Sequence, residues 1–163
     1  MTRAPKPAPG RPPGQTAPRS WLHDLLRTID DDLVEFAAVR DRAAAADVLR
    51  PAFVADWLRM TTFQPGLGPV LWAESPQATV ARLERDWDRP DVGHVKMTPT
   101  GANAMRAMDD PPPALRAFYD GYAARGPTSP HGLAADVEQE VEAVMSLALV
   151  PAGLTTTGPG RTG

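Results

Sequence analysis

Proline sets the strongest constraint on how this chain of 163 residues can fold, because 19 of its residues are proline. Proline lacks a backbone N–H and clashes with the preceding turn, so a helix tolerates it in the first turn and breaks where it occurs later. Only short helices fit between the prolines of the central region, which are Pro51, Pro65, Pro69, Pro76, Pro90, Pro99, Pro111, Pro112, Pro113, Pro127 and Pro130.

Both ends of the sequence are too poor in large apolar side chains to build a core. Residues 1–19 contain six prolines and four basic residues, and residues 151–163 contain four glycines. Such segments bury too little surface to offset the entropy lost on ordering. We therefore expect a disordered basic tail over 1–19, a helical domain over 20–150 and a second disordered tail over 151–163. A single domain of that length is typical.

Capping residues and apolar spacing predict an all-α fold, a single-core bundle of about six helices. Ser20 is a good N-cap for a first helix, whose apolar residues recur at spacings of three and four and could extend to Ala46. Pro51 is expected to open a second helix that ends near Thr62. The remaining helices are predicted over residues 76–88, 98–108, 115–126 and 134–149.

Two short apolar runs are candidate strands of a minor two-stranded element. They cover residues 70–73 and 94–97. The sequence leaves open whether these runs pair with each other, because strand pairing depends on contacts far apart in the chain.

Composition excludes several classes of protein. The chain has no cysteine, which excludes disulfides, thiolate nucleophiles and cysteine-bound metals. Its formal net charge is −3, which does not favour nucleic acid as a partner. No apolar run is long enough for a membrane span, and no apolar segment follows the basic N-terminal residues as a secretory signal requires. We expect a cytoplasmic protein from a bacterium.

Acidic residues cluster at one place, where Asp30, Asp31, Asp32 and Glu35 could share a helix face. Helical di-metal sites need Glu-x-x-His pairs that project inward, and this sequence contains none. We interpret the cluster as a solvated surface, and we predict no metal and no cofactor.

No motif in the sequence identifies a catalytic residue. The three histidines lie in three different predicted elements, and His23 is interpreted as a partner of Asp24 at the start of the first helix. No serine has the setting of a nucleophile elbow, and the glycines near residue 66 lack the lysine of a phosphate-binding loop. If the chain is nevertheless a small enzyme, the first candidates for an inter-helix pocket are Asp91, His94, Tyr119 and Tyr122.

Residues 94–108 resemble the strand, Thr-Pro-x-Gly turn and helix that follow the wing in bacterial winged-helix regulators of the multiple-antibiotic-resistance type. The resemblance implies a recognition helix over 76–88, a dimer, and a DNA-binding surface made by Arg82, Arg85, Arg89 and Lys96. Acidic residues balance the arginines of that helix, whereas DNA-facing helices usually carry a net positive surface.

Taken together, the sequence favours a small, non-enzymatic interaction or accessory protein that presents helix faces to a protein partner. A homodimer is compatible with this interpretation. The winged-helix regulator and the small enzyme with a pocket near His94 remain the alternatives.

Overall fold

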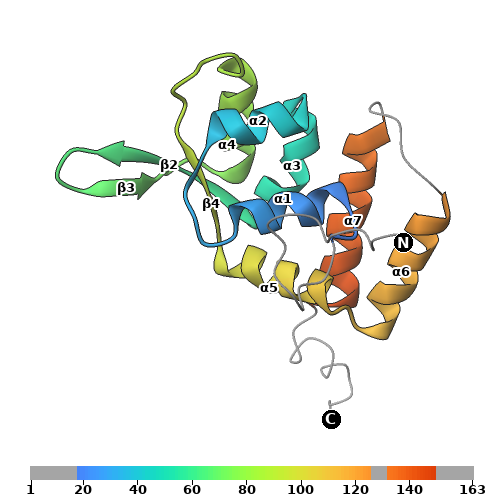
Figure 1. The fold of residues 1–163 in the computed structure, drawn as a ribbon. Coiled ribbons are helices and arrows are strands. Elements are labelled where there is room, and N and C mark those ends of the chain that lie inside the picture. The colour runs from blue at the N-terminus through green and yellow to red at the C-terminus, as the bar shows by residue number, and fades with distance from the viewer. Residues whose placement is uncertain (1–17, 126–131, 150–163) are drawn as a thin grey trace, which may run out of the picture.

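The computed structural model describes residues 18–125 and 132–149, and it contains seven helices and four strands within them (Figure 1). Their order is α1 (Trp21–Ile29), β1 (Val34–Glu35), α2 (Phe36–Ala43), α3 (Ala46–Val54), β2 (Leu58–Gln64), β3 (Gly68–Leu71), α4 (Pro76–Arg85), β4 (His94–Met97), α5 (Pro99–Asp109), α6 (Pro113–Arg125) and α7 (Leu133–Leu147). The predicted tails cover residues 1–19 and 151–163. Residues 1–17 and 151–163 lie outside the described residues, whereas Arg19 is described and its side chain donates to the carbonyl of Met108 at 2.9 Å.

The four strands form one antiparallel sheet in the order β1-β4-β2-β3. Strand β4 is late in the sequence but central in the sheet, where Val95 lies opposite Val34 of β1 and Met60 of β2. Strands β2 and β3 form a hairpin whose far end projects from the body of the molecule (Figure 1).

This sheet contradicts the predicted all-α fold with a minor two-stranded element. The fold is mixed, with seven helices and four strands among the described residues. Residues 94–97 do form a strand, and β3 overlaps the other predicted run. The two do not pair, because β2 lies between them.

The two predicted helices in the first third of the domain are also wrong. Helix α1 ends at Ile29, and Asp30 takes a positive φ of 42° before the chain enters β1. Helix α3 begins at Ala46, so Pro51 lies inside it and does not open it. Residues 58–64, expected in the same helix, form β2 because their alternate side chains Leu58 and Met60 face the core.

The helix starts predicted from capping residues are confirmed where a side chain closes the first turn. The hydroxyl of Ser20 accepts a hydrogen bond from the N–H of His23, and that of Ser75 accepts one from Ala78. Each cap satisfies a backbone donor that the helix itself leaves without a partner.

Among the described residues, helices cover one face of the sheet and leave the other uncovered. Helices α1 and α2 contact β4, and α3 contacts β2. On that side the strands contribute buried Leu58, Met60, Val95 and Met97 to the core. The alternate residue of β4, Lys96, is exposed on the opposite face. The sheet therefore has one core face and one open face.

A close backbone approach fixes helix α5 to the start of β2. The N–H of Thr98 donates to the carbonyl of Trp57 at 3.0 Å, and its hydroxyl donates to the carbonyl of Asp56 at 2.5 Å. Gly101 packs so tightly here that a Cβ atom would collide with the carbonyl oxygen of Trp57. Glycine at position 101 is therefore required by the fold.

We predict opposite effects for two glycine substitutions. Gly101→Ala should lower the free energy of unfolding by about 2–3 kcal/mol, because the added methyl group has no space. Gly121→Ala, in the exposed face of α6 with open space around it, should raise it by about 0.5–1 kcal/mol. Urea denaturation of both variants measures the difference, and equal changes would contradict the close packing at Gly101.

Candidate interaction surface on the sheet

The residues of the predicted DNA-binding surface do not form one basic patch. Arg82 lies in α4 with its guanidinium 3.7 Å from the ring centre of Trp72 and 3.0 Å from the carboxylate of Glu74. Its charge is therefore already engaged. Lys96 is on the open face of the sheet, whereas α4 packs on the core face, where Thr79 lines a gap with Met60.

The other two arginines of that predicted surface each have a nearby carboxylate. Arg85 lies 3.8 Å from Asp86, and Arg89 lies 3.6 Å from Asp91. These pairs are solvent-exposed and contribute little to stability, but they lower the net positive potential beside α4.

The four residues of the predicted pocket are also dispersed. His94 lies in β4, and Asp91 lies in the exposed connection before it. Tyr119 is buried on α6, where its hydroxyl donates to Glu140. Tyr122 lines an open groove of about 500 Å³ with Trp21 and Leu133. Within the described residues, His94 and the two tyrosines lie on separate elements and do not share the groove that Tyr122 lines.

The acidic cluster is solvated, but it does not share a helix face as predicted, because α1 ends at Ile29 and Glu35 lies in β1. Asp30, Asp31, Asp32 and Glu35 are all exposed, in and beside the connection between α1 and β1. Within residues 18–125 and 132–149, no group of three or more potential metal ligands converges.

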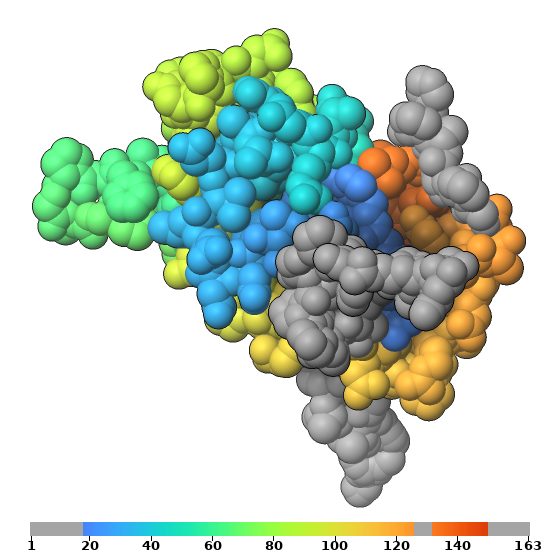
Figure 2. Space-filling view, viewed as in Figure 1, coloured from blue at the N-terminus to red at the C-terminus, as the bar shows by residue number. Residues whose placement is uncertain are grey.

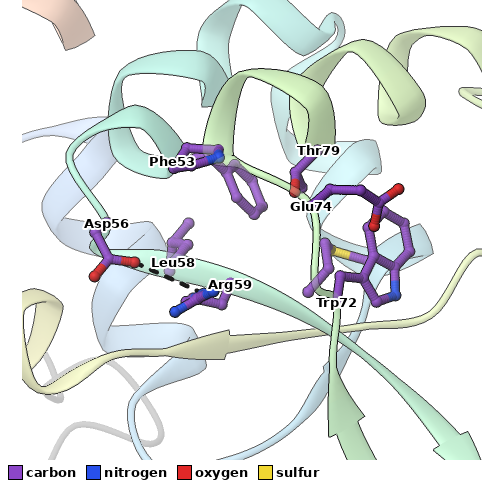
Figure 3. Close-up of a pocket in the computed structure, with 9 residues that line it drawn as sticks. Phe53, Asp56, Leu58, Arg59, Trp72, Glu74 and Thr79 are labelled. Atoms are coloured by element: carbon purple, nitrogen blue, oxygen red, sulfur yellow. Dashed lines mark ion pairs between the residues drawn. The ribbon is translucent and has the colours of Figure 1, made fainter.

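The gap between α3, β2 and α4 is too small for a substrate (Figure 3). Phe53, Leu58 and Trp72 line it, and its space of about 10 Å³ is room for about one water molecule. Asp56 and Arg59 at its rim form an ion pair at 3.8 Å.

Sequence reasoning missed the most distinctive surface, which we call the open face: Arg59, Phe63, Pro69, Leu71, His94 and Lys96. Register places these side chains together, since Phe63 lies opposite Pro69 and Arg59 lies opposite Lys96. Phe63 is 56% exposed and Leu71 is 46% exposed. The projecting hairpin that carries them stands clear of the body in the space-filling view (Figure 2).

The tip of the hairpin extends the apolar surface. Gly66 and Gly68 adopt positive φ values of 80° and 77°, which permit the tight reversal of the chain. Leu67 lies between them and is 72% exposed. The run Gln64-Pro-Gly-Leu-Gly-Pro69 predicts a helix break and a turn held by alternating glycine and proline; the structure confirms the turn but places it in a hairpin, which the sequence did not predict.

One polar atom of the open face lacks a partner. The ring of His94 meets that of Phe63 edge to face, with the ring centres 5.5 Å apart. The Nδ1 atom of His94 is buried and forms no hydrogen bond within the described part of the chain. A buried polar atom without a partner is uncommon in folded proteins and costs desolvation energy.

The outer edge of the hairpin is protected against pairing with another strand. The N–H of Trp72 donates to the carbonyl of Met60, so Val70 and Gly68 also turn their backbone groups toward β2. Leu71 and Pro69 then turn theirs outward, and Pro69 has no N–H to offer. Proline at an outward position of an edge strand discourages strand addition.

A second feature that the sequence did not reveal is a buried polar cluster between α1, α6 and α7. Glu140 is 1% exposed and accepts hydrogen bonds from Ser20, at 2.6 Å, and from Tyr119. Burial raises the pKa of the Glu140 carboxyl, and burial also raises the pKa of the Tyr119 hydroxyl. These hydrogen bonds link α1, α6 and α7.

His23 belongs to the same region and is fully buried, so the predicted surface pairing with Asp24 is wrong. Its Nδ1 accepts from the N–H of Arg19 at 3.0 Å, and its Nε2 lies 2.7 Å from Asp109. Both ring nitrogens are occupied, and Ser20 contacts the backbone N–H of His23, not its ring. Ser20, His23 and Asp109 therefore do not form a catalytic triad.

We predict that His23 makes the fold less stable in mild acid. Burial lowers the pKa of His23 below its usual 6.5, so the unfolded chain takes up the proton first. The stabilisation from neutral His23 is present above pH 6.5 and is lost as the pH falls toward the pKa of the folded state. Urea denaturation from pH 7.5 to 5.0 should show this loss, and His94→Gln should retain it while His23→Leu should not. An unchanged pH slope in His23→Leu would contradict the assignment.

Comparison with known proteins gives no relative for this chain: no family model, no curated protein and no solved structure matches it. Among the described helices, none combines the length and the apolar character that crossing a membrane requires. The open face is thus assigned from the geometry of this chain.

Proposed function

We propose that this protein is a non-enzymatic interaction module that binds a partner protein on the open face of its sheet. The observation that carries the proposal is the exposure of Phe63, Leu67 and Leu71 together on one projecting hairpin. Scattered apolar residues are normal on protein surfaces, whereas a contiguous group is typical of an interaction site.

The location of these residues also supports binding as their role. The far half of the hairpin adds nothing to the core, which β2 contacts through Leu58 and Met60 near its start. A chain that needed only a stable fold could carry polar residues at the tip. The exposure of the apolar residues on the hairpin therefore suits a role in binding and not a role in stability.

The geometry favours docking on the face of the sheet over addition of a strand at its edge. Pro69 removes one of the outward N–H groups that an added strand would need. An aromatic side chain such as Phe63 offers a large contact area at low entropic cost, which suits an anchor at the centre of an interface.

A second candidate function is DNA binding, which one observation favours. Helices α2 and α3 are joined by a short turn in which Ala44 has a φ of 68°, and the β2–β3 hairpin follows them. A helix-turn-helix pair followed by a hairpin is the order found in winged-helix proteins. The relevant helix would then be α3, not the segment 76–88.

The charges near α3 make DNA binding the weaker of the two candidate functions. Arg50 of α3 donates to both Asp47, at 2.9 Å, and Glu84, at 3.2 Å. The helix also packs against α4 and α7, and the hairpin tip presents Leu67 where a DNA-binding wing would present a cation.

We predict weak binding of duplex DNA. At about 150 mM salt, the dissociation constant should be no tighter than the non-specific range of about 10⁻⁴–10⁻⁶ M, because few cations are free to contact phosphates. Fluorescence anisotropy with a pool of random duplexes measures it. Nanomolar binding that Arg50→Ala weakens would instead support the DNA-binding candidate.

We predict a position-specific crosslink from the hairpin. With a photo-reactive benzoyl-phenylalanine in place of Phe63, irradiation in a cell extract should yield an adduct with one other protein, identified by mass spectrometry. The same group at Leu147, exposed on α7, is the matched control and should not give that adduct. The double variant Leu67→Ser/Leu71→Ser should abolish the adduct while changing stability by less than about 0.5 kcal/mol.

Two outcomes of the crosslinking experiment would contradict the proposal. Identical adducts from Phe63 and Leu147 would mean that the hairpin has no special role. An adduct formed only with a second copy of this chain would replace the partner with self-association.

A further inference from the structure

We infer that the partner presents an acidic, apolar segment to the open face, with a carboxylate placed between Arg59 and Lys96. This inference rests on the proposed function and specifies the chemistry of the partner. It starts from the register of β2 and β4, which sets Arg59 directly opposite Lys96.

Two like charges directly opposite each other on a sheet destabilise it. The pair is notable here because the protein as a whole carries a net charge of −3, so it does not follow from an excess of basic residues. An anion bound between Arg59 and Lys96 would attract both side chains and so offset their mutual repulsion. Arg59 and Lys96 therefore form a ready site for a carboxylate.

The neighbouring acidic groups of the chain do not fill this site. Asp56 is 3.8 Å from Arg59 and partly offsets its charge, in an exposed pair of low strength. Glu35 lies opposite His94 in β1, the strand next to β4, and forms no ion pair with Lys96 within the described residues. Lys96 has no ion pair within the described residues. Lys96 is therefore available to pair with a carboxylate that a second molecule supplies.

The apolar part of the segment follows from the spacing along β2. Phe63 is four residues from Arg59 on the same face, which corresponds to about 13 Å of strand. A partner segment of about four to six residues can therefore place a carboxylate at the two cations and a large apolar side chain against Phe63 and Leu71. His94 lies between these two ends, with its Nδ1 still without a partner.

Nucleic acid fits this surface less well than a peptide. A phosphate could take the place of the carboxylate, but the next phosphates along a strand would meet the uncharged hairpin tip around Leu67. Apolar side chains beside one anionic group are instead a property of peptides. The occupant to which we commit is an acidic peptide segment of a partner protein.

Selection from a phage-displayed library of random dodecapeptides on the immobilised full chain tests the inference. We expect the recovered peptides to combine Asp or Glu with a large apolar residue within six positions. Lys96→Glu should weaken the best peptide about tenfold, a change typical of a charge pair at an interface. The control Arg85→Glu makes the same charge change on α4 and should have no effect.

The outcomes separate the inference from the proposed function. In one outcome, Phe63→Ser abolishes peptide binding, but the peptides carry no acidic residue and Lys96→Glu leaves their affinity unchanged. This result would overturn the inference and leave the docking surface in place. Peptides that ignore Phe63→Ser as well would overturn both. If a single-stranded oligothymidine binds more tightly than the best peptide and this binding depends on Lys96, the site is assigned to nucleic acid. That result would overturn the inference of an acidic peptide.

A stability measurement distinguishes loss of a direct contact at Lys96 from loss of the folded structure. Lys96→Glu replaces a repulsion with an attraction toward Arg59, so the variant should unfold at the same or a higher urea concentration than the original chain. Loss of peptide binding together with lower stability would mean that Lys96 acts through the fold, and it would overturn the inference.

Discussion

The position of β4 between β1 and β2 is the constraint on which the rest of the structure depends. Residues 94–97 hydrogen-bond to a strand from the start of the domain on one side and to the hairpin on the other. Thr98 follows immediately and fixes α5 to the carbonyl groups of Asp56 and Trp57. One short segment thus joins the sheet to the helices, and it also determines which face of the sheet the helices can cover.

The two faces of the sheet use polar and apolar groups in opposite ways. Beneath the core face, Ser20, Tyr119 and Glu140 form one hydrogen-bonded network, although Nε1 of buried Trp57 has no hydrogen bond within the described residues. On the open face, apolar Phe63 is exposed and Nδ1 of His94 has no hydrogen bond in the described part of the chain. The core arrangement suits stability, whereas the proposed docking role depends on the exposed apolar side chains of the open face.

Local signals in the sequence could predict the later helices but not the sheet. Ser75 with Pro76 and Thr98 with Pro99 mark helix starts, because capping and proline act within one turn. Strand β1 is two residues long, and β2 contains Leu58 at a spacing from Phe53, Val54 and Trp57 that also fits a helix. Pairing with β4, more than thirty residues later, decides between the two. The open face was missed for the same reason, since it exists only once these strands are in register.

Mapping of amide chemical shifts tests the docking claim most directly. The isotopically labelled full chain would be titrated with the partner protein that the photo-crosslink at position 63 identifies. We expect shifts concentrated in residues 58–72 and 94–97, with the amides of α6 and α7 unchanged. Shifts concentrated on helix surfaces, with the hairpin unaffected, would contradict the claim that the open face of the sheet is the binding surface.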